Sequence, residues 1–313
     1  MHTGIVVLGS VFVDVKGYPF SAYIPAGRNA GRVVQVHGGV CRNVVEDIAN
    51  VELRPTFLSL VDETGTGTDV ISKLNKHKVN TDYMIRTPDG MGTWLAVFDQ
   101  DGDVVASISQ RPDLMPLCDV LDEKGDAIIS ACDSIVVEFD MDKEILKRVF
   151  TLAERYHKQV FAVISNMSIA LKRRDLLQHT AGFVCNQQEA GILFAENYET
   201  VEPAQMQAIL AERVRQAGIP CMVVTMGGQG AVFADQEGNN GYVPAKKVHV
   251  RDTTGAGDAF FSGFAIGLTY GKSLSEACEI GTRLAASVIT TAENVCPRFR
   301  PEEFGLMLTW QEQ

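Results

Sequence analysis

The sequence lacks an excess of basic residues, and this limits the partners that it can bind. Its 313 residues include 28 lysines and arginines against 39 aspartates and glutamates, which gives a formal net charge of −11 at neutral pH. An acidic chain repels a phosphate polyanion, so we expect no nucleic acid among its partners. A small anionic substrate is compatible with this charge, because local dipoles oppose the overall field.

The sequence also lacks a long apolar run. A membrane-spanning helix needs ~20 consecutive apolar residues. The most apolar long segment, Ala259 to Leu268, is shorter and is interrupted by Ser262, Gly263 and Gly267. The residues after Met1 do not form the basic region of a secretory signal peptide. We therefore expect a cytoplasmic protein that has no membrane partner.

The cysteines lack the spacings of disulfide-rich or zinc-binding chains. The seven stand at positions 41, 118, 132, 185, 221, 278 and 296, with no C-x-x-C pair. An odd number in a chain of this size disfavours a disulfide framework. The six histidines do not cluster near them, which disfavours zinc. We expect reduced, mostly buried thiols.

Strand and helix patterns alternate along most of the chain. A hydrophobic content of 46% is typical of a globular protein, and the length fits one large domain or two. Beyond residue 134, strands are expected at 134–139, 160–164, 182–185 and 221–225, with helices at 143–157, 203–216, 256–268 and 274–290. Before it, strands at 5–8 and 56–61 alternate with helices at 40–51 and 69–78. This order predicts a mostly parallel sheet covered on both faces.

Two short-strand patches interrupt the alternation. Residues 18–36 are punctuated by glycine and proline, and segments 93–98 and 104–109 flank an Asp-Gln-Asp-Gly turn at 99–102. We predict that insertions at about 15–37 and 91–111 pair as a small lid sheet beside one domain spanning 1–313. Because exposed sheet edges favour pairing with another chain, we also expect a homodimer through the lid.

One string of residues, Asp252 to Asp258, carries the chemistry. It reads Asp-Thr-Thr-Gly-Ala-Gly-Asp and precedes an apolar helical run. Its two glycines allow a tight turn that exposes backbone N–H groups, and a helix start adds the positive end of its dipole, which together favour an anion. Asp258 then falls in the first helical turn, where its carboxylate can accept a proton from a hydroxyl nucleophile. The alternative reading is close packing by Gly-Ala-Gly, with Asp258 as a helix-capping acid.

This string resembles the D-T-x-G-A-G-D signature of the ribokinase-like, or PfkB, family of carbohydrate and nucleoside kinases. Four weaker elements of that family occur in the family's order. They are Gly9-Ser10 with Asp14, Gly38-Gly39 followed by Asn43, Asn186-Gln187-Gln188-Glu189, and Thr225-Met226-Gly227-Gly228-Gln229-Gly230. The resemblance covers essentially the whole chain. It implies an ATP-dependent sugar or nucleoside kinase with a three-layer α/β/α sandwich.

The resemblance also implies a role for each element. Asp258 would be the general base on a primary hydroxyl, and the N–H groups of Gly255, Ala256 and Gly257 would hold the transferring phosphoryl group. The residues implied for sugar binding are Asp14, Gly38, Gly39 and Asn43.

The remaining elements would bind the nucleotide and its ions. Asn186, Thr225, Gly227, Gly230 and Thr254 would contact ATP. Glu189 would place Mg²⁺ through water, although Asn186 and Glu189 also fit a helix capping box. Asp252 and Thr254 would border a monovalent-cation site, which is K⁺ in several members of the family.

Several stretches of the sequence bear on the identity of the sugar. Residues 29–33 and the Gly-Gly-Val-x-Arg-Asn-Val-x-Glu stretch at 38–46 are similar to pseudouridine kinases, and Trp94 and His37 are candidates for packing on a base or for the lid core. Ribose, fructose and keto-deoxy sugar acids remain alternatives, as does a non-catalytic sugar-binding regulator. No G-x-G-x-x-G follows the first strand, which disfavours a dehydrogenase. The string Gly267 to Ser273 has one residue too few for a P-loop and is interpreted as a helix end and the next helix start.

Overall fold

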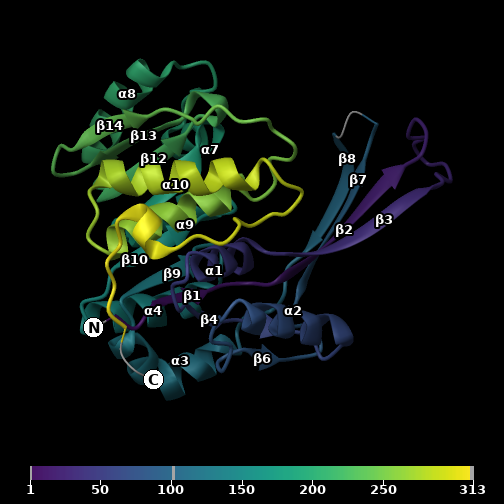
Figure 1. The fold of residues 1–313 in the computed structure, drawn as a ribbon, viewed down its shortest axis with the longest axis horizontal. Helices are drawn as coiled ribbons and strands as arrows, with labels where there is room; N and C mark the ends of the chain where they lie inside the picture. The colour runs from purple at the N-terminus through teal and green to yellow at the C-terminus, as the bar shows by residue number, and fades with distance from the viewer. Residues whose placement is uncertain (1, 101–102, 311–313) are drawn as a thin grey trace.

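The structure, a computed structural model, describes residues 2–100 and 103–310, which form β-sheets of eight, four and two strands (Figure 1). The large sheet has eight strands in the order β14-β13-β12-β11-β10-β9-β1-β4. Six neighbouring strands run parallel: β1 (Ile5–Leu8), β4 (Thr56–Leu58), β9 (Ser134–Glu138), β10 (Val160–Val163), β11 (Gly182–Asn186) and β12 (Cys221–Thr225). The hairpin strands β13 (Ala231–Asp235) and β14 (Asn240–Val243) add an antiparallel edge. The predicted mostly parallel sheet is confirmed.

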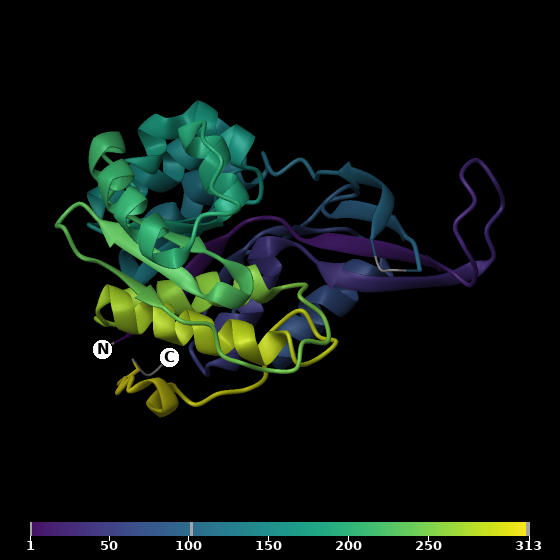
Figure 2. The same cartoon turned by 90° about the horizontal axis from the view of Figure 1, so that it is seen from above.

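Helices cover both faces of the large sheet, as Figure 2 shows from above. On one face lie α1 (Val40–Asn50), α2 (Gly65–Lys76), α9 (Ala256–Thr269) and α10 (Leu274–Val288). On the other lie α3 (Leu117–Ala131), α4 (Lys143–Arg155), α5 (Met167–Ala170), α6 (Arg174–Leu177), α7 (Gln187–Phe194) and α8 (Pro203–Ala217). A separate hydrophobic core lies on each face of the large sheet, and the alternating side chains of β1 contribute to both. Ile5 and Val7 pack with α1 and α9, whereas Val6 and Leu8 pack with α3 and α4. The three-layer sandwich is therefore confirmed.

The prediction of one strand at 56–61 is wrong. The chain leaves the large sheet at Ser59, whose hydroxyl donates to the Gly9 carbonyl at 2.6 Å. Strand β5 (Leu60–Val61) then pairs with β6 (Ile85–Arg86) in a separate two-stranded sheet. Helices α3, α5 and α6 are absent from the elements expected above, and α7 was indicated only by the alternative of a capping box at Asn186 and Glu189.

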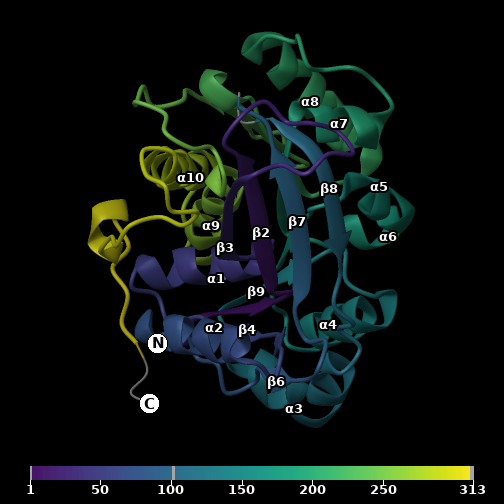
Figure 3. The same ribbon diagram turned by 90° about the vertical axis from the view of Figure 1, so that its right-hand side faces the viewer.

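The two inserted hairpins pair with each other in a four-stranded sheet of order β3-β2-β7-β8 (Figure 3). Its strands are β2 (Phe12–Pro19), β3 (Gly31–Gly38), β7 (Gly92–Phe98) and β8 (Val104–Gln110). Strands β2 and β7 run parallel at the centre and join the hairpins. The glycine of the expected turn at 99–102 lies outside the described residues. In Figures 1 and 2 this small sheet extends away from the three layers.

The two faces of the small sheet differ in character. Asp14 lies directly opposite Trp94 and Val36, so these three side chains share one face. Trp94 packs edge-to-face on Phe98 of the same face. His37 lies opposite Val13 and therefore points to the other face, away from Asp14. Of the two residues considered for contact with a base, only Trp94 shares the face of Asp14.

The string from Gly267 to Ser273 is a helix junction, as predicted. Gly267 lies inside α9, where an added Cβ would come within 2.6 Å of Ala277. Gly271 follows the helix with φ +76°, and Ser273 caps α10 in a capping box with Glu276. A P-loop would instead follow a strand.

All seven cysteines are buried and unpaired, as expected from their spacing. Over the described part of the chain, none of the helices combines the length and the apolar character that crossing a bilayer requires.

Candidate active site

The turn before α9 needs glycine for two different reasons. Gly255 has φ +82°, and a Cβ there would lie 2.1 Å from the Asn294 carbonyl oxygen. An added Cβ on Gly257 would meet nothing within 4 Å, so this glycine borders open space. The N–H of Ala256 donates to the Thr253 carbonyl at 3.2 Å and closes the turn. Backbone and helix dipole thus face a free volume at the start of α9.

Asp258 lies in the first turn of α9 beside that volume. Burial raises the pKa of Asp258 to about 6, although the hydrogen bond from Asn43 and the charge of Arg42 oppose the rise. The carboxyl group is therefore mostly ionised at neutral pH and remains basic enough to take a proton.

Asn43 and Asp14 converge on the same point. Asn43 donates from Nδ2 to Oδ2 of Asp258 at 2.7 Å, and its buried Oδ1 has no hydrogen-bond partner among the described residues. A Cβ on Gly38 would come within 2.4 Å of the Asp14 carboxylate. Burial raises the pKa of Asp14, against the charges of Lys16 and Arg42. Gly38 thus leaves room for a carboxylate and an amide that can both bind hydroxyl groups.

A buried ion pair holds the glycine loop in place. Gly39 has φ +97°, and a Cβ there would lie 2.7 Å from the Ser10 carbonyl oxygen. Arg42 donates from Nε to the Gly38 carbonyl at 3.3 Å and also to the His37 carbonyl. Arg42 binds Glu46 at 2.7 Å in turn. Arg42 and Glu46, which contributed to the similarity with pseudouridine kinases, therefore bind each other and the backbone.

Sequence reasoning did not single out Glu138, which binds Ser10 of the predicted Gly9-Ser10 element. Glu138 ends β9, and its Oε2 accepts hydrogen bonds from the N–H and the hydroxyl of Ser10, each at 2.7 Å. Burial raises the pKa of Glu138, and the charge of Glu138 contributes to the raised pKa of Asp258. An acidic residue at the end of an otherwise apolar strand was the available signal, because the carboxyl ends of parallel strands meet at one edge.

The residues implied for nucleotide binding follow two adjacent strands. Asn186 and Thr225 are register partners at the ends of β11 and β12. Asn186 and Glu189 form a capping box at the start of α7, with both bonds at 2.8 Å. This is the alternative left open above, and it directs Glu189 back toward its own helix end. Burial raises the pKa of Glu189, and the nearby charge of Asp140 adds to the rise.

The glycines after β12 shape the neighbouring turn. Gly227 has φ +54° and borders open space, whereas Gly230 has φ +102° and would clash with the Val243 carbonyl if it carried a Cβ. The Thr225 hydroxyl donates to the Cys185 carbonyl at 3.3 Å. Gly227 therefore leaves a ligand access to the backbone, and Gly230 fixes the hairpin.

Asp252 and Thr254 form a local turn next to the loop after α10. Asp252 accepts the N–H of Thr254 at 2.8 Å, and the N–H of Arg251 donates to the Ile289 carbonyl. Burial raises the pKa of Asp252, but the hydrogen bonds from Thr254 outweigh it and leave a lowered value. Asp252 is thus a charged group beside the end of α10, where its own N–H donates to the Ile289 carbonyl.

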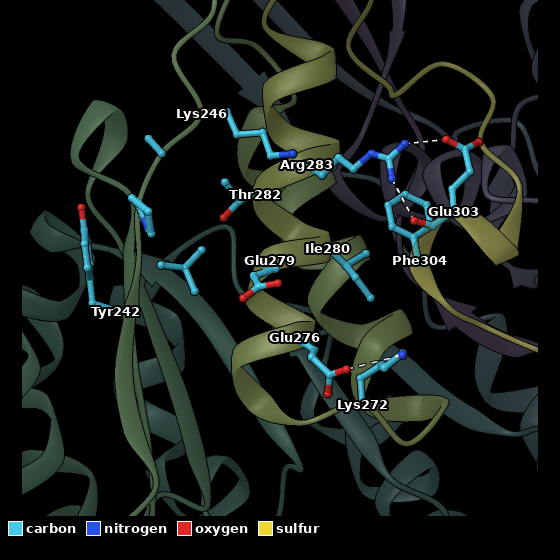
Figure 4. Close-up of a pocket in the computed structure, with 13 residues that line it drawn as sticks. Tyr242, Lys246, Lys272, Glu276, Glu279, Ile280, Thr282, Arg283, Glu303 and Phe304 are labelled. Atoms are coloured by element: carbon cyan, nitrogen blue, oxygen red, sulfur yellow. Dashed lines mark hydrogen bonds and ion pairs between the residues drawn. The ribbon is translucent and has the colours of Figure 1, made fainter.

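Two cavities differ in their relation to these residues. A cavity of about 550 Å³ lies between β14 and α10, where Figure 4 shows Arg283 bonded to Glu303 and Lys272 beside Glu276. None of the predicted site residues lines it. A second cavity, of about 270 Å³, is lined by Ser10 and Glu138 and therefore adjoins the site.

Comparisons with known proteins identify the family to which the chain belongs. The model of the pfkB family carbohydrate kinases matches residues 2–295. The chain is 36% identical to a guanosine-inosine kinase of Exiguobacterium acetylicum, over 93% of this chain and 95% of that protein. It is 26% identical to the pseudouridine kinase of Escherichia coli K12, over 83% and 82%. The ribokinase of Arabidopsis thaliana, solved with ribose and ATP, shares the fold with a TM-score of 0.82 at 19% identity, over 99% of this chain and all of that one. The chain therefore belongs to the pfkB family of carbohydrate kinases and is a phosphotransferase that acts on an alcohol group.

Proposed function

We propose that the protein transfers the γ-phosphoryl group of ATP to the primary 5′-hydroxyl of a purine ribonucleoside of the guanosine–inosine type. The observation that carries the chemistry is Asp258, a carboxylate of raised pKa held by Asn43 beside the open start of α9. The 36% identity to a guanosine-inosine kinase supports a nucleoside as acceptor. The lower identity to a pseudouridine kinase and the structural role of Arg42 and Glu46 make pseudouridine the second candidate.

In the proposed reaction, each group at the site has a distinct task. Asn43 binds Oδ2 of Asp258, which leaves Oδ1 for the substrate hydroxyl. As the hydroxyl oxygen forms its bond to phosphorus, its proton passes to Asp258 and the bond to the leaving ADP breaks. The backbone of Gly255 to Gly257 would stabilise the charge on the transferring group. Asp14, Asn43 and the glycine loop would orient the ribose hydroxyls.

We also propose Mg²⁺ as the companion of ATP. Within the described residues no group of three or more His, Cys, Asp and Glu side chains is arranged to hold a metal. That fits a Mg²⁺ ion bound mostly by phosphates and water, with Glu189 as an indirect partner. Bound Mg²⁺ would neutralise phosphate charge, while Asn186, Thr225, Gly227, Gly230 and Thr254 would position the nucleotide.

A monovalent cation near Asp252 remains a proposal. The support is the proximity of the Asp252 loop to the carbonyl of Ile289. If K⁺ binds there, replacing potassium by lithium at constant ionic strength should lower kcat. An unchanged rate in lithium salts contradicts the proposal.

The acceptor can be identified by measuring ATP consumption with a panel of compounds. Guanosine and inosine should give the highest kcat/KM, above pseudouridine, ribose and fructose. Asp258→Asn should lower kcat by ~10²–10⁴-fold, the range of general-base catalysis. Turnover confined to a free sugar contradicts the nucleoside proposal, and an unchanged rate in Asp258→Asn contradicts the mechanism.

We further propose that two chains associate through the small sheet and that the protein works in the cytoplasm. Val33, Leu95 and Ile108, on the face opposite Asp14, are 68%, 42% and 69% exposed. Apolar exposure of this kind favours an interface. Seven unpaired thiols suit a reducing compartment.

A further inference from the structure

The cavity beside the site is built from chain segments that follow three different strands. Ser10 follows β1, Glu138 ends β9 and precedes Asp140, and Arg111 follows β8. Its volume of about 270 Å³ equals roughly nine water molecules at ~30 Å³ each. Because Glu138 lines this cavity and lies close enough for its charge to contribute to the raised pKa of Asp258, a ligand bound at Asp258 could extend into the cavity.

Asp140 gives the cavity a hydrogen-bond acceptor that the protein itself does not satisfy. Its side chain is fully buried. Oδ2 is bound by Arg111 at 3.0 Å and by the Ser165 hydroxyl. Oδ1 is also buried and has no hydrogen-bond partner among the described residues. A buried carboxylate oxygen without a donor is unfavourable, so a ligand that brings an N–H group would be bound there.

Arg111 adds donors beside that acceptor. The guanidinium carries five N–H groups, and the bonds to Asp140 and Ser165 both use the same nitrogen, Nη2. The Arg111 side chain is 44% exposed, which leaves its other nitrogens available to a ligand. The cavity thus presents an acceptor next to donors. The matching edge of a ring has an N–H beside a carbonyl oxygen, as guanine and hypoxanthine have at N1 and O6.

We propose that this cavity binds the purine base, with Asp140 Oδ1 accepting the N1–H of guanine or hypoxanthine and Arg111 donating to O6. The inference rests on the proposed function and deepens it, because it names the residues that select the base. Adenine has no proton on N1, so its N1 lone pair would face the carboxylate. A site that hydrogen-bonds a substrate N–H rejects an analogue that lacks it.

Changing the substrate tests the assignment without altering the protein. The wild-type enzyme should use inosine and guanosine with a kcat/KM at least ~100-fold above those of adenosine and 1-methylinosine. The added methyl group removes the N1–H and leaves the ribose unchanged. Equal kcat/KM for inosine and 1-methylinosine would overturn the proposal.

Asp140→Asn tests the residue itself. Arg111 can only donate, so the introduced amide should keep its oxygen toward Arg111 and turn its NH₂ group toward the base. The NH₂ group cannot accept a hydrogen bond from N1–H of hypoxanthine, but it can donate one to N1 of adenine. The preference for inosine over adenosine should therefore fall by at least ~10-fold. The matched control is Asp122→Asn, because Asp122 on α3 also accepts a hydrogen bond from an arginine, Arg148 at 2.8 Å, but does not line this cavity. The control should retain the wild-type preference.

The outcomes separate the two levels of the proposal. If the wild type phosphorylates ribose and no nucleoside, the proposed function fails. If it phosphorylates nucleosides and Asp140→Asn leaves the inosine-to-adenosine ratio unchanged, only the base assignment fails. A higher Mg²⁺ requirement of Asp140→Asn at an unchanged ratio would instead assign Asp140 to the metal near Glu189, and it too overturns the proposal.

Discussion

At the scale of single residues, we expect the hydrogen bond between Asn43 and Asp258 to set the pH dependence of the proposed reaction. The pKa of Asp258 is about 6 because burial disfavours its charged form, while the Asn43 amide opposes this effect. We expect kcat/KM to rise with pH and to level off above an apparent pKa near 6. Asn43→Ala removes the opposing hydrogen bond, so the pKa of Asp258 should rise and the acidic limb should move to higher pH.

The pH–rate profile of the two enzymes between about pH 5 and pH 9 measures this shift. Arg42 also lowers the pKa of Asp258, but substituting it would disturb the glycine loop, which makes Asn43 the cleaner position. An acidic limb that stays in place, or moves to lower pH, contradicts the assignment of Asp258 as the titrating base.

Substitutions of Gly255 and Gly257, which lie in the same turn, should differ in their effects on stability and on catalysis. A Cβ on Gly257 enters open space, so Gly257→Ala should fold normally, and its methyl group should occupy part of the volume that we propose for the phosphoryl group. We expect kcat to fall by ~10²–10³-fold, as when one anion-binding donor is lost, with Tm changed little. Gly255→Ala should lower both, because its Cβ would collide with the Asn294 carbonyl.

Thermal unfolding and steady-state kinetics of both variants provide the comparison. Full activity of Gly257→Ala would show that no ligand approaches the backbone there.

At the scale of elements, Asp47 connects α1 to the C-terminal loop and makes stability depend on pH. It accepts the Cys296 N–H at 2.6 Å and the Ser262 hydroxyl at 3.3 Å. Burial raises its pKa to about 8, although the bonds from Cys296 oppose the rise. In the unfolded chain an aspartate titrates near ~3.9, so between about pH 4 and pH 8 the folded protein holds a proton that the unfolded chain has released. The free energy of unfolding that Asp47 contributes therefore falls as the pH rises through this window.

Asp47→Asn removes that titration. Relative to the wild type it should gain about 5 kcal/mol of stability as the pH rises from 4 to 8, at ~1.4 kcal/mol per pKa unit, and it should differ least near pH 4. Urea unfolding at several pH values measures the difference, with the exposed Asp69→Asn as the control. A constant offset at all pH values would mean that Asp47 does not titrate in the folded protein.

The elements also explain which features the sequence could predict. Strands β1 and β9 to β12 are continuous apolar runs, because helices cover both of their faces, and this made the parallel sheet recognisable. The extent of α7 was not predicted, because Gln187 to Phe194 is short and has little apolar periodicity. Only its start was indicated, by the capping-box alternative at Asn186 and Glu189. Ser59 breaks a run that looks uniform, since its effect depends on a hydroxyl bond to Gly9, a residue distant in sequence.

The same limit applies to the candidate site. Gly255, Gly257 and Asp258 are contiguous, so their arrangement follows from one turn and one helix start. Glu138 and Asp140 become important only when β8, β9 and β1 bring Arg111 and Ser10 beside them. Neither periodicity nor local spacing encodes those contacts between strand ends.

At the scale of the whole molecule, the small sheet has an apolar face that the rest of the described chain leaves exposed. All of β8 is exposed, and Leu95 and Ile108 are direct cross-strand partners on the face opposite Asp14. The small sheet is a single layer of strands, so nothing in the described part of the same chain covers the apolar side chains on its outer face. Exposed apolar groups of this kind are typical of an interface with another chain. A second copy of the same sheet would cover the face and leave the side of Asp14 open to substrate.

Ile108→Asp tests this association. The charge should prevent apolar contact and convert a dimer into a monomer, because an unpaired carboxylate at a buried interface is strongly unfavourable. Light scattering at micromolar concentration measures the molecular mass, and Met307→Asp is the matched control, since Met307 is 85% exposed and lies far from the small sheet in sequence. If the sheet also depends on the second chain for its shape, KM for the acceptor should rise in Ile108→Asp while the control keeps the wild-type value. A monomeric wild type, or a dimer that persists in Ile108→Asp, would contradict the proposed association through the small sheet.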